Sequence, residues 1–477
     1  LVEIGYRTTI QNMDSIRMLV SGREVDPANL AERRKGITNS WPELRFKDFD
    51  IHGLNDKQAN YVEKSIRKTD SVIDVEEVKL EYMKLANDPS LVYLYPRAVY
   101  DPKDSLFTLR LRLIPEATLE ARFGLFFSTT GLAQTHLGFS YRAISEVSTH
   151  LKGSIQFGRL YDGINLGLRF DYPSKIPLYF QGSFNYNGFD YNTSSTTFFF
   201  EDLKPSYIVE NEMNFRFDVG IPYSMNGVIT GGLGIGRNHE VYYVTKDFAS
   251  DDTSDVSKVN LMSIYAASER NSLNNKQYST AGSLRKFSVR FGYGSESYLP
   301  GSTSMQVINE KLNYLWFTAR MESAGYFPIK GSFSLGYHYV MQVTIKPVLN
   351  TYFSTIIEAP VFQPNLITNG LFMEKYRAHQ FIAAGIKPVY RFNKQIHAKL
   401  EAYGFFPLQE ILADQNNDAY LGTYFNTMKT LFNASLNVIT RAGPVGLHAG
   451  YVTEEEKPWM FQISFGYLLF NKRSTDE

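Results

Sequence analysis

The sequence has no cysteine, no long apolar run and no excess of either charge. Without cysteine among 477 residues, disulfides and thiol-based metal or redox chemistry are excluded. No stretch of about eighteen or more apolar residues occurs, so no transmembrane helix is expected, and the mean hydropathy is −0.25. The 49 basic residues balance 49 acidic ones. Because no basic stripe is present either, nothing indicates a nucleic-acid partner.

What the chain does have, from about residue 117 onward, is side-chain alternation with a period of two. In 213–219, polar Asn214, Arg216 and Asp218 alternate with apolar residues, and 118–125 and 396–403 repeat the pattern. Such alternation predicts strands of a sheet whose two faces meet different media. A soluble sandwich turns its polar face outward, whereas a membrane barrel turns it toward a wet lumen.

Strand number and loop lengths favour the barrel. About sixteen strand candidates are centred near Phe123, Phe139, Ile155, Leu168, Phe184, Phe217, Gly232, Tyr265, Phe287, Phe317, Tyr337, Ile386, Leu400, Leu436, Leu447 and Phe465. Short turns after even-numbered candidates are Pro173–Lys175, Ser224–Gly227, Pro328–Gly331 and Asn393–Gln395, and long loops after odd-numbered ones are about 190–210, 245–260, 346–380 and 408–428. An even strand number with long loops at one rim predicts a closed antiparallel transmembrane barrel. Because its lumen is too wide for side chains to fill, we expect loop 346–380 to fold inward.

Four parts are expected along the chain. Residues 1–40 comprise a helix, with apolar residues at helical spacing over 1–20, and a polar connector. Residues 41–115 form a small α+β unit in the order strand, helix, helix, strand, strand, with Asp74 as the N-cap of the second helix. Residues 116–470 form the barrel, and 471–477 are a short tail. The predicted fold is therefore mainly β.

This order resembles the BamA/TamA-like superfamily, in which periplasmic POTRA domains precede a sixteen-stranded barrel. The strand beginning Gly443-Pro444 and containing Gly450 is similar to that superfamily's penultimate strand. The closing strand through Phe465 and Phe470 is similar to its aromatic-ended last strand, although here NKRSTDE follows. The resemblance implies a bacterial outer-membrane location with a POTRA-like unit in the periplasm.

The resemblance also suggests a role for the long loop. In that superfamily the sixth external loop usually enters the lumen and carries an Arg-Gly-aromatic signature that meets an acidic group. The loop here holds Tyr376 and Arg377, with Phe381 at its end, but lacks the glycine. The resemblance thus implies a lumenal acid contact for Arg377, and the alternative is an ordinary solvated or lumen-facing arginine.

More narrowly, the chain resembles patatin-like phospholipases fused to a barrel. The order of N-terminal helix, connector with Ala31–Arg34, one POTRA-like unit, barrel and FGYLLFNKRS ending carries this resemblance. It implies that residues 1–20 are the last helix of a patatin domain, and that the parent polypeptide is a serine hydrolase of lipid metabolism in a Gram-negative envelope.

No catalytic, cofactor-binding or metal residues are expected in these 477 residues. No Gly-x-Ser-x-Gly elbow occurs, and the nearest match is 293–297, at a predicted strand end. Asp162-Gly163 is typical of a hairpin turn. The run Gly231–Gly236 precedes no helix, so it predicts close approach of a plug or neighbouring side chain inside a strand. The histidines that a barrel could bring together are His379, His397 and His448. Whether the chain belongs to an enzyme is left open.

The main hypothesis is an outer-membrane anchor or translocation domain of a patatin-like phospholipase. The alternatives are a BamA/TamA-like factor for protein translocation or outer-membrane protein assembly, a non-catalytic subunit of an envelope complex, and a passive porin. Expected partners are outer-membrane lipid and lipopolysaccharide, with other envelope proteins. The acidic runs Asp251-Asp252 and 454–456 are expected either to be solvated or to bind lipopolysaccharide through divalent cations.

Overall fold

The computed structural model describes residues 2–21, 30–34, 36, 42–66, 72–130, 132–173, 178–191, 208–244, 249, 251–304, 310–454 and 458–475. Most of the predicted turn 173–175, most of the predicted loop 190–210, much of the connector before Pro42 and most of the acidic run 454–456 lie outside these ranges.

The N-terminal segment forms two helices, α1 (Val2–Gln11) and α2 (Met13–Val20), where the sequence predicted one. The helix is interrupted at Asn12, whose side-chain amide donates to the Thr8 carbonyl oxygen (2.8 Å). Such local bonding by an asparagine competes with the regular helical pattern. No described helix is both long and apolar enough to cross a membrane.

The small α+β unit has the predicted element order. It contains β1 (Phe46–His52), α4 (Asp56–Ile66), α5 (Val75–Ala86), β2 (Leu91–Asp101) and β3 (Leu106–Pro115), with sheet order β1-β3-β2. Asn55 and Gln58 form a reciprocal capping box at the start of α4 (3.0 and 3.1 Å). Asp74 caps α5 by accepting from the Glu77 amide (2.9 Å), as predicted.

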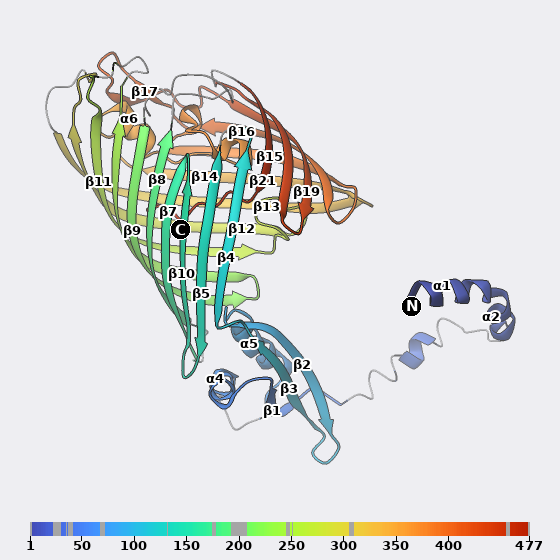
Figure 1. The fold of residues 1–477 in the computed structure, drawn as a ribbon. Coiled ribbons are helices and arrows are strands. Elements are labelled where there is room, and N and C mark those ends of the chain that lie inside the picture. Colours follow the sequence, from blue (N-terminus) through green and yellow to red (C-terminus); the bar gives the residue numbers. More distant parts are fainter. Residues whose placement is uncertain are drawn as a thin grey trace. The chain divides into compact units, whose positions relative to one another are not determined.

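Sixteen antiparallel strands close into one barrel, as the sequence predicted (Figure 1). They are β4 (Leu119–Ser128), β5 (Ala133–Ile144), β6 (Ser148–Gly158), β7 (Tyr161–Tyr172), β8 (Leu178–Tyr191), β9 (Ile208–Ser224), β10 (Gly227–Tyr242), β11 (Asp255–Asn271), β12 (Ser283–Leu299), β13 (Glu310–Lys330), β14 (Phe333–Ile345), β15 (Gln380–Arg391), β16 (Ile396–Pro407), β19 (Lys429–Thr440), β20 (Gly443–Val452) and β21 (Trp459–Gly466). Each predicted strand centre falls in a different one of these strands. The loop after β16 adds a small hairpin, β17 (Ile411–Ala413) and β18 (Ala419–Leu421).

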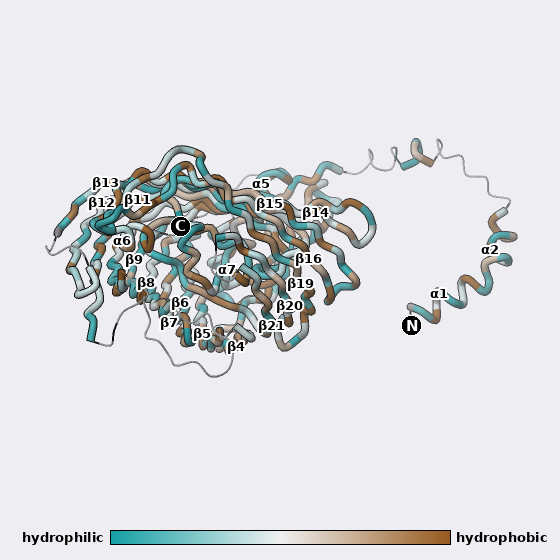
Figure 2. Tube along the Cα trace, turned by 90° about the horizontal axis from the view of Figure 1, so that it is seen from above, coloured by the Kyte–Doolittle hydropathy of each residue, from teal (hydrophilic) through white to brown (hydrophobic). Residues whose placement is uncertain are grey.

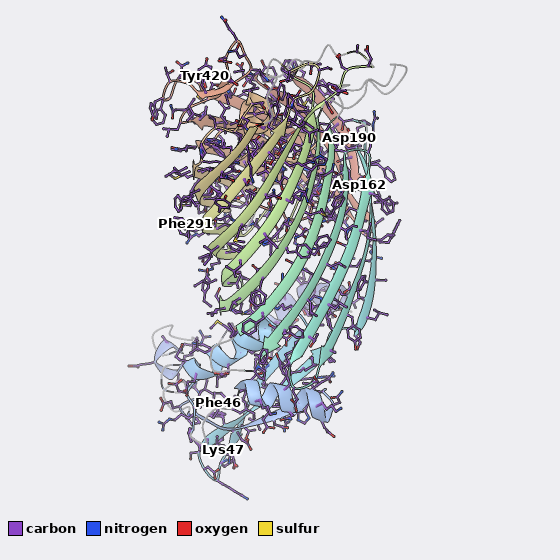
Figure 3. All side chains as sticks on the ribbon, turned by 90° about the vertical axis from the view of Figure 1, so that its left-hand side faces the viewer. Phe46, Lys47, Asp162, Asp190, Phe291 and Tyr420 are labelled. Carbon is purple, nitrogen blue, oxygen red and sulfur yellow. The ribbon has the colours of Figure 1, made fainter. Side chains whose placement is uncertain are left out.

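The barrel turns its apolar face outward and its polar face inward. On β9, Phe215 and Phe217 are 55% and 50% exposed, whereas Asn214 and Arg216 are 1% and 5% exposed. Figure 3 shows Phe291 of β12 on the outer wall, and Figure 2 shows hydrophobic and hydrophilic residues alternating around the ring. This polarity is the reverse of that of a soluble sandwich, so the barrel is built to sit in lipid.

The closing strand is shorter than predicted. Strand β21 ends at Gly466, so Phe470 belongs to no strand and the prediction of a closing strand through Phe470 is wrong. Gly466 has φ of +93°, and a Cβ built there would lie 1.8 Å from the Leu125 carbonyl oxygen. Glycine alone fits this position, and the chain leaves the sheet there, although the residues that follow, Tyr467–Phe470, are apolar and aromatic like those of a strand.

Candidate functional site: the filled lumen and the closing seam

The long loop 346–379 enters the barrel, as its length suggested. It carries α6 (Tyr352–Ile357), α7 (Leu366–Asn369) and a 3-10 turn, η1 (Glu374–Tyr376). Thr351 and Asn365 cap the two helices through capping boxes, which lets short helices form locally. Figure 2 shows α6 and α7 inside the ring of strands.

Contacts to several strands hold this loop in the lumen. The Tyr242 hydroxyl of β10 lies 2.7 Å from the Thr351 hydroxyl, and the Glu296 carboxylate of β12 accepts from the Asn350 amide (2.9 Å). Inside the loop region, Lys346 and Glu358 form a buried ion pair (3.3 Å). The loop is therefore an ordered part of the barrel interior.

Arg377 lies inside the barrel and fastens the loop to itself. Its guanidinium donates to four carbonyl oxygens: those of Phe372 (3.0 Å), Ile356 (3.3 Å), Ile357 (2.7 Å) and Ala359 (3.3 Å). Ile356 and Ile357 end α6, so the cation sits at the negative end of that helix dipole. The hydrogen bonds described for Arg377 are to carbonyls, and the acid contact implied by the resemblance stays a prediction.

Tyr376 and Phe381 anchor the end of the same loop to the wall. The Tyr376 hydroxyl donates to the Thr430 carbonyl oxygen (2.7 Å), and its ring packs on Phe405 with centroids 5.5 Å apart. Phe381, the second residue of β15, pairs with Pro407 of β16 and also packs on Phe405 (5.0 Å). Both side chains are buried, so they close the base of the loop where it rejoins the sheet.

The glycine-rich penultimate strand fits between its neighbours and the loop. Gly443 opens β20 with φ of +140°, Pro444 pairs with Ile439, and Phe465 of β21 pairs with Val445. A Cβ on Gly450 would lie 2.7 Å from the Ile367 side chain of α7. Gly450 thus leaves room for the loop, which is a packing reason for glycine there.

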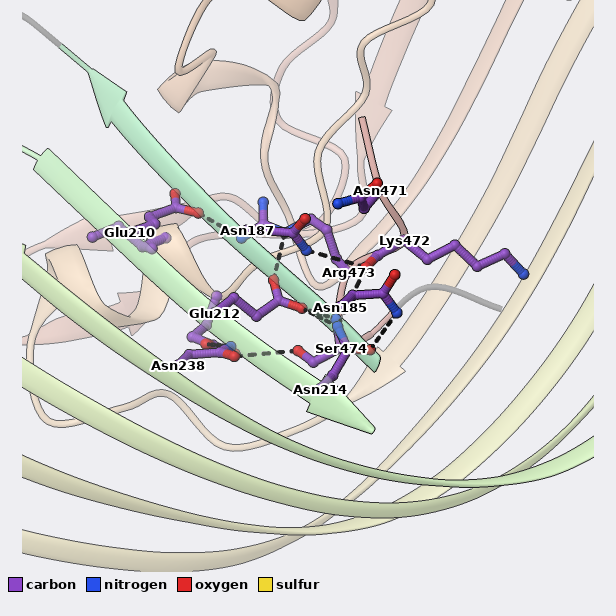
Figure 4. Close-up of polar contacts among 12 residues, drawn as sticks. Asn185, Asn187, Glu210, Glu212, Asn214, Asn238, Asn471, Lys472, Arg473 and Ser474 are labelled. Atoms are coloured by element: carbon purple, nitrogen blue, oxygen red, sulfur yellow. Dashed lines mark hydrogen bonds and ion pairs between the residues drawn. The ribbon is translucent and has the colours of Figure 1, made fainter. Parts of the chain in front are cut away.

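The C-terminal tail also lies inside the barrel, which the sequence analysis did not predict (Figure 4). Arg473 pairs with Glu210 (2.5 Å) and Glu212 (3.2 Å) on β9. Arg290 of β12 donates to the Ser474 carbonyl oxygen (2.9 Å). The lumenal acids of β9 therefore meet an arginine from the tail.

The seam that closes the barrel, between β21 and β4, is short. The register pairs Ser464 with Ser128, Phe465 with Phe127 and Gly466 with Phe126. One further backbone hydrogen bond joins the Thr129 amide to the Ile463 carbonyl oxygen (3.0 Å). Within the described residues, the register with β21 does not reach 119–125 of β4, whose other edge pairs with β5.

A second inward segment lies beside this seam. Residues 272–282, between β11 and β12, place the Tyr278 ring against His448, with centroids 6.1 Å apart. Gln277 accepts from the Leu468 amide (3.1 Å), just past the end of β21. This segment therefore supports the point at which the chain leaves the sheet.

A cavity of about 600 Å³ remains between loop, tail and wall. Its charged lining includes Arg216, Glu269, Arg320, Glu322 and Arg473. In the described ranges, no three histidine, aspartate or glutamate side chains are grouped to hold a metal, and His379, His397 and His448 form no such set. The cavity therefore presents both cationic and anionic side chains to the lumen.

Three solved structures are similar to this chain in fold. BamA from Haemophilus ducreyi lacking POTRA domains 1–3 has a TM-score of 0.54 at 12% identity, covering 89% of this chain and 84% of that one. CdiB from Acinetobacter baumannii has a TM-score of 0.54 at 10% identity, covering 89% and 74%. CdiB from Escherichia coli has a TM-score of 0.53 at 9% identity, covering 89% and 77%. This chain has the fold of BamA and CdiB.

At the level of sequence, this chain matches no protein-family model and no curated protein. A closed barrel of sixteen strands with an apolar outer face and a polar lumen has the polarity of an outer-membrane barrel. The periplasmic location of the small α+β unit stays a prediction.

Proposed function

We propose that this barrel inserts or translocates polypeptides at the outer membrane. The observation that carries the proposal is the closing seam, where β21 leaves β4 after Gly466. A strand edge with unsatisfied backbone groups is a template for adding another strand, and it is costly to leave in lipid. A seam of few pairs costs less to separate than the other strand pairs of the barrel.

The filled lumen argues against a passive porin. Loop 346–379 and the tail both cross the interior, and ordered contacts hold each of them to the wall. A porin of this size would keep a wide aqueous channel. An interior that is filled at rest, beside a seam with few pairs, fits a barrel that works on polypeptides.

A reversible lock of the seam tests the proposal. Ser128→Cys with Ser464→Cys places two thiols on directly paired residues, in a chain with no native cysteine. In proteoliposomes, we expect the reduced double variant to accelerate folding of a urea-denatured eight-stranded outer-membrane barrel. The oxidised variant should fall to the rate of empty liposomes, and reductant should restore it.

The matched control places the same bond elsewhere in the wall. Ser154→Cys with Asn165→Cys joins β6 to β7, away from the seam, and should leave acceleration unchanged whether oxidised or reduced. Equal acceleration by the locked and unlocked seam would refute the proposal, and so would the absence of acceleration by the unmodified protein.

An anchor for a lipase domain is the second candidate function, although the similarity to BamA and CdiB does not support it. One observation favours it: Ile4, Met18 and Leu19 of α1 and α2 are 66%, 80% and 81% exposed. Helices with such apolar residues exposed fit a surface that another domain covers. Fatty-acid release from phospholipid vesicles by the longer parent polypeptide, but not by these 477 residues, would support it. The absence of fatty-acid release by either protein would refute the lipase-anchor hypothesis.

The proposal also covers the partners of the barrel and the bounds of its domains. Other envelope proteins are the proposed partners, as clients or as subunits. Binding of lipopolysaccharide through Asp251-Asp252 remains a prediction. The Asp252 carboxylate also accepts a hydrogen bond from the Ala249 amide of the same loop (2.7 Å). We keep 1–40 and 41–115 as proposed domains, and we start the tail at Tyr467 instead of 471 because β21 ends at Gly466.

A further inference from the structure

The wall of the lumen holds the tail mainly by its backbone. The Gln134 side chain of β5 both accepts from the Leu469 amide (2.9 Å) and donates to its carbonyl oxygen (2.7 Å). The Asn471 amide donates to the Tyr161 hydroxyl (2.9 Å). Contacts of this kind recognise an extended chain whatever its side chains are.

The same pattern continues across the next strands. Asn187 and Asn214, on β8 and β9, both donate to the Lys472 carbonyl oxygen (3.1 and 3.3 Å). The Ser474 amide donates to Glu212, and Arg290 donates to the Ser474 carbonyl oxygen (2.9 Å). We call this row of wall residues the lumenal strip: Gln134, Tyr161, Asn187, Glu210, Glu212, Asn214 and Arg290.

Two side chains of the tail add selectivity. Phe470 packs against Tyr161 (centroids 4.9 Å apart, edge-on) and Phe189 (5.7 Å). Three residues later, Arg473 meets the paired carboxylates Glu210 and Glu212. The strip therefore offers an aromatic pocket and an acidic pocket at a fixed spacing along an extended chain.

Glycines in the wall make the room that a chain needs. A Cβ on Gly236 of β10 would lie 2.8 Å from the Ser474 Cβ. A Cβ on Gly163 of β7 would lie 2.8 Å from the Asn471 side-chain nitrogen. Larger residues at these two positions would close the groove, so the wall is shaped around a bound backbone.

We propose that the lumenal strip is a binding site for an extended polypeptide, and that residues 467–475 occupy it in cis until a client displaces them. The site would take a segment with an aromatic residue and, three positions later, an arginine or lysine. This inference rests on the proposed function and names the feature of the client that is recognised inside the barrel.

The arrangement makes exchange physically reasonable. The described tail residues after Gly466 belong to no strand, so the tail can leave the wall without breaking a strand pair. Lys472, Arg473 and Ser474 also line the cavity of about 600 Å³, which gives an incoming chain space beside the tail. A client that displaces the tail from the lumenal strip would release the end of β21 at the seam.

Peptide binding tests the site directly. A fluorescent peptide of residues 467–475, YLLFNKRST, is titrated in detergent against full-length Arg473→Glu, whose own tail is repelled by Glu210 and Glu212. We expect saturable binding to this variant, and little binding to the parent chain or to Arg441→Glu, which has the same charge change in an exposed turn. The peptide with alanine in place of its arginine should bind about thirtyfold more weakly or worse.

A chain ending at Gly466 provides a second receptor and should bind the peptide as Arg473→Glu does. Heat-modifiable migration in electrophoresis confirms that each barrel is folded. No saturable binding to a folded Arg473→Glu barrel, or equal affinity for the peptide without its arginine, would overturn the proposal.

A tail lock separates this inference from the proposed function. Asn238→Cys with Ser474→Cys replaces two side chains that are hydrogen bonded to each other (3.3 Å), and should form a disulfide that keeps the tail on the strip. We expect oxidation to slow client folding and reductant to restore it. If the seam lock blocks folding but the tail lock does not, the strip proposal fails and the proposed function stands. If no client folds at all, the proposed function fails, and peptide binding alone decides the strip.

Discussion

Valine in place of Gly466 should make the closing strand continue along β4 and withdraw the tail from the lumen. The present turn needs φ of +93° at residue 466, and a Cβ there would lie 1.8 Å from the Leu125 carbonyl oxygen. A β-branched residue strongly disfavours that conformation and favours an extended strand. Continuing the present register would pair Tyr467 with Leu125.

A disulfide reports this change. Leu125→Cys with Tyr467→Cys should cross-link on oxidation in the Gly466→Val background and stay uncross-linked when Gly466 is kept. Gly182→Val is the control, because a Cβ at that position of β8 has nothing within 4 Å and no unusual φ. Equal cross-linking with and without Gly466→Val would mean that Gly466 does not direct the chain out of the sheet.

Alanine in place of Arg377 should release the long loop and open the lumen to ions. The substitution removes the hydrogen bonds to four buried carbonyl oxygens, which should destabilise the docked loop by roughly 3 kcal/mol or more. A barrel of sixteen strands is too wide to stay closed without such a plug. Conductance in planar lipid bilayers should therefore rise severalfold.

A conservative variant and a control variant show whether the conductance depends on the guanidinium of Arg377. Arg377→Lys keeps the charge but not the planar fork of donors, so its conductance should lie between those of the parent and Arg377→Ala. Arg441→Ala changes an exposed arginine in a turn and should leave conductance unchanged. Parent-like conductance and unchanged protease resistance of loop 346–379 in Arg377→Ala would show that other contacts hold the loop.

The barrel could be predicted because its signal is local. Each strand alternates in its own sequence, so Asn214, Arg216 and Asp218 could be assigned to the lumen before any neighbour was known. The lengths of the loops then indicated which end of each strand lies at which rim of the barrel. The small α+β unit could be predicted from its helix caps and from the spacing of its apolar residues. Nothing in these patterns depends on which strand pairs with which.

The interior could not be predicted because it depends on contacts between distant residues. The segment Tyr467–Phe470 is apolar and aromatic like a strand, and the positive φ at Gly466 ends the pairing. The inward polar face of β9, with Glu210 and Glu212, was visible as a pattern, but its partner Arg473 lies at the far end of the chain. The basic pair Lys472-Arg473, a few residues beyond the closing strand, was the available signal.

The long loop, the tail and the seam depend on one another. The loop fills the lumen, the tail draws the end of β21 inward, and the seam is left with few pairs. Gln277 and Tyr278 brace the point where β21 ends. A client that displaced the tail would act on the strand that closes the barrel, which couples recognition in the lumen to opening at the seam.

Photo-cross-linking shows whether clients engage the barrel at the β4 edge, as proposed. A photoreactive phenylalanine analogue replaces either Phe123 on β4 or Phe291 on β12, which are 67% and 60% exposed on the outer face. During folding of a client barrel in proteoliposomes, we expect client adducts at position 123 and none above background at 291. Adducts of equal yield at both positions, or at 291 alone, would contradict the proposal.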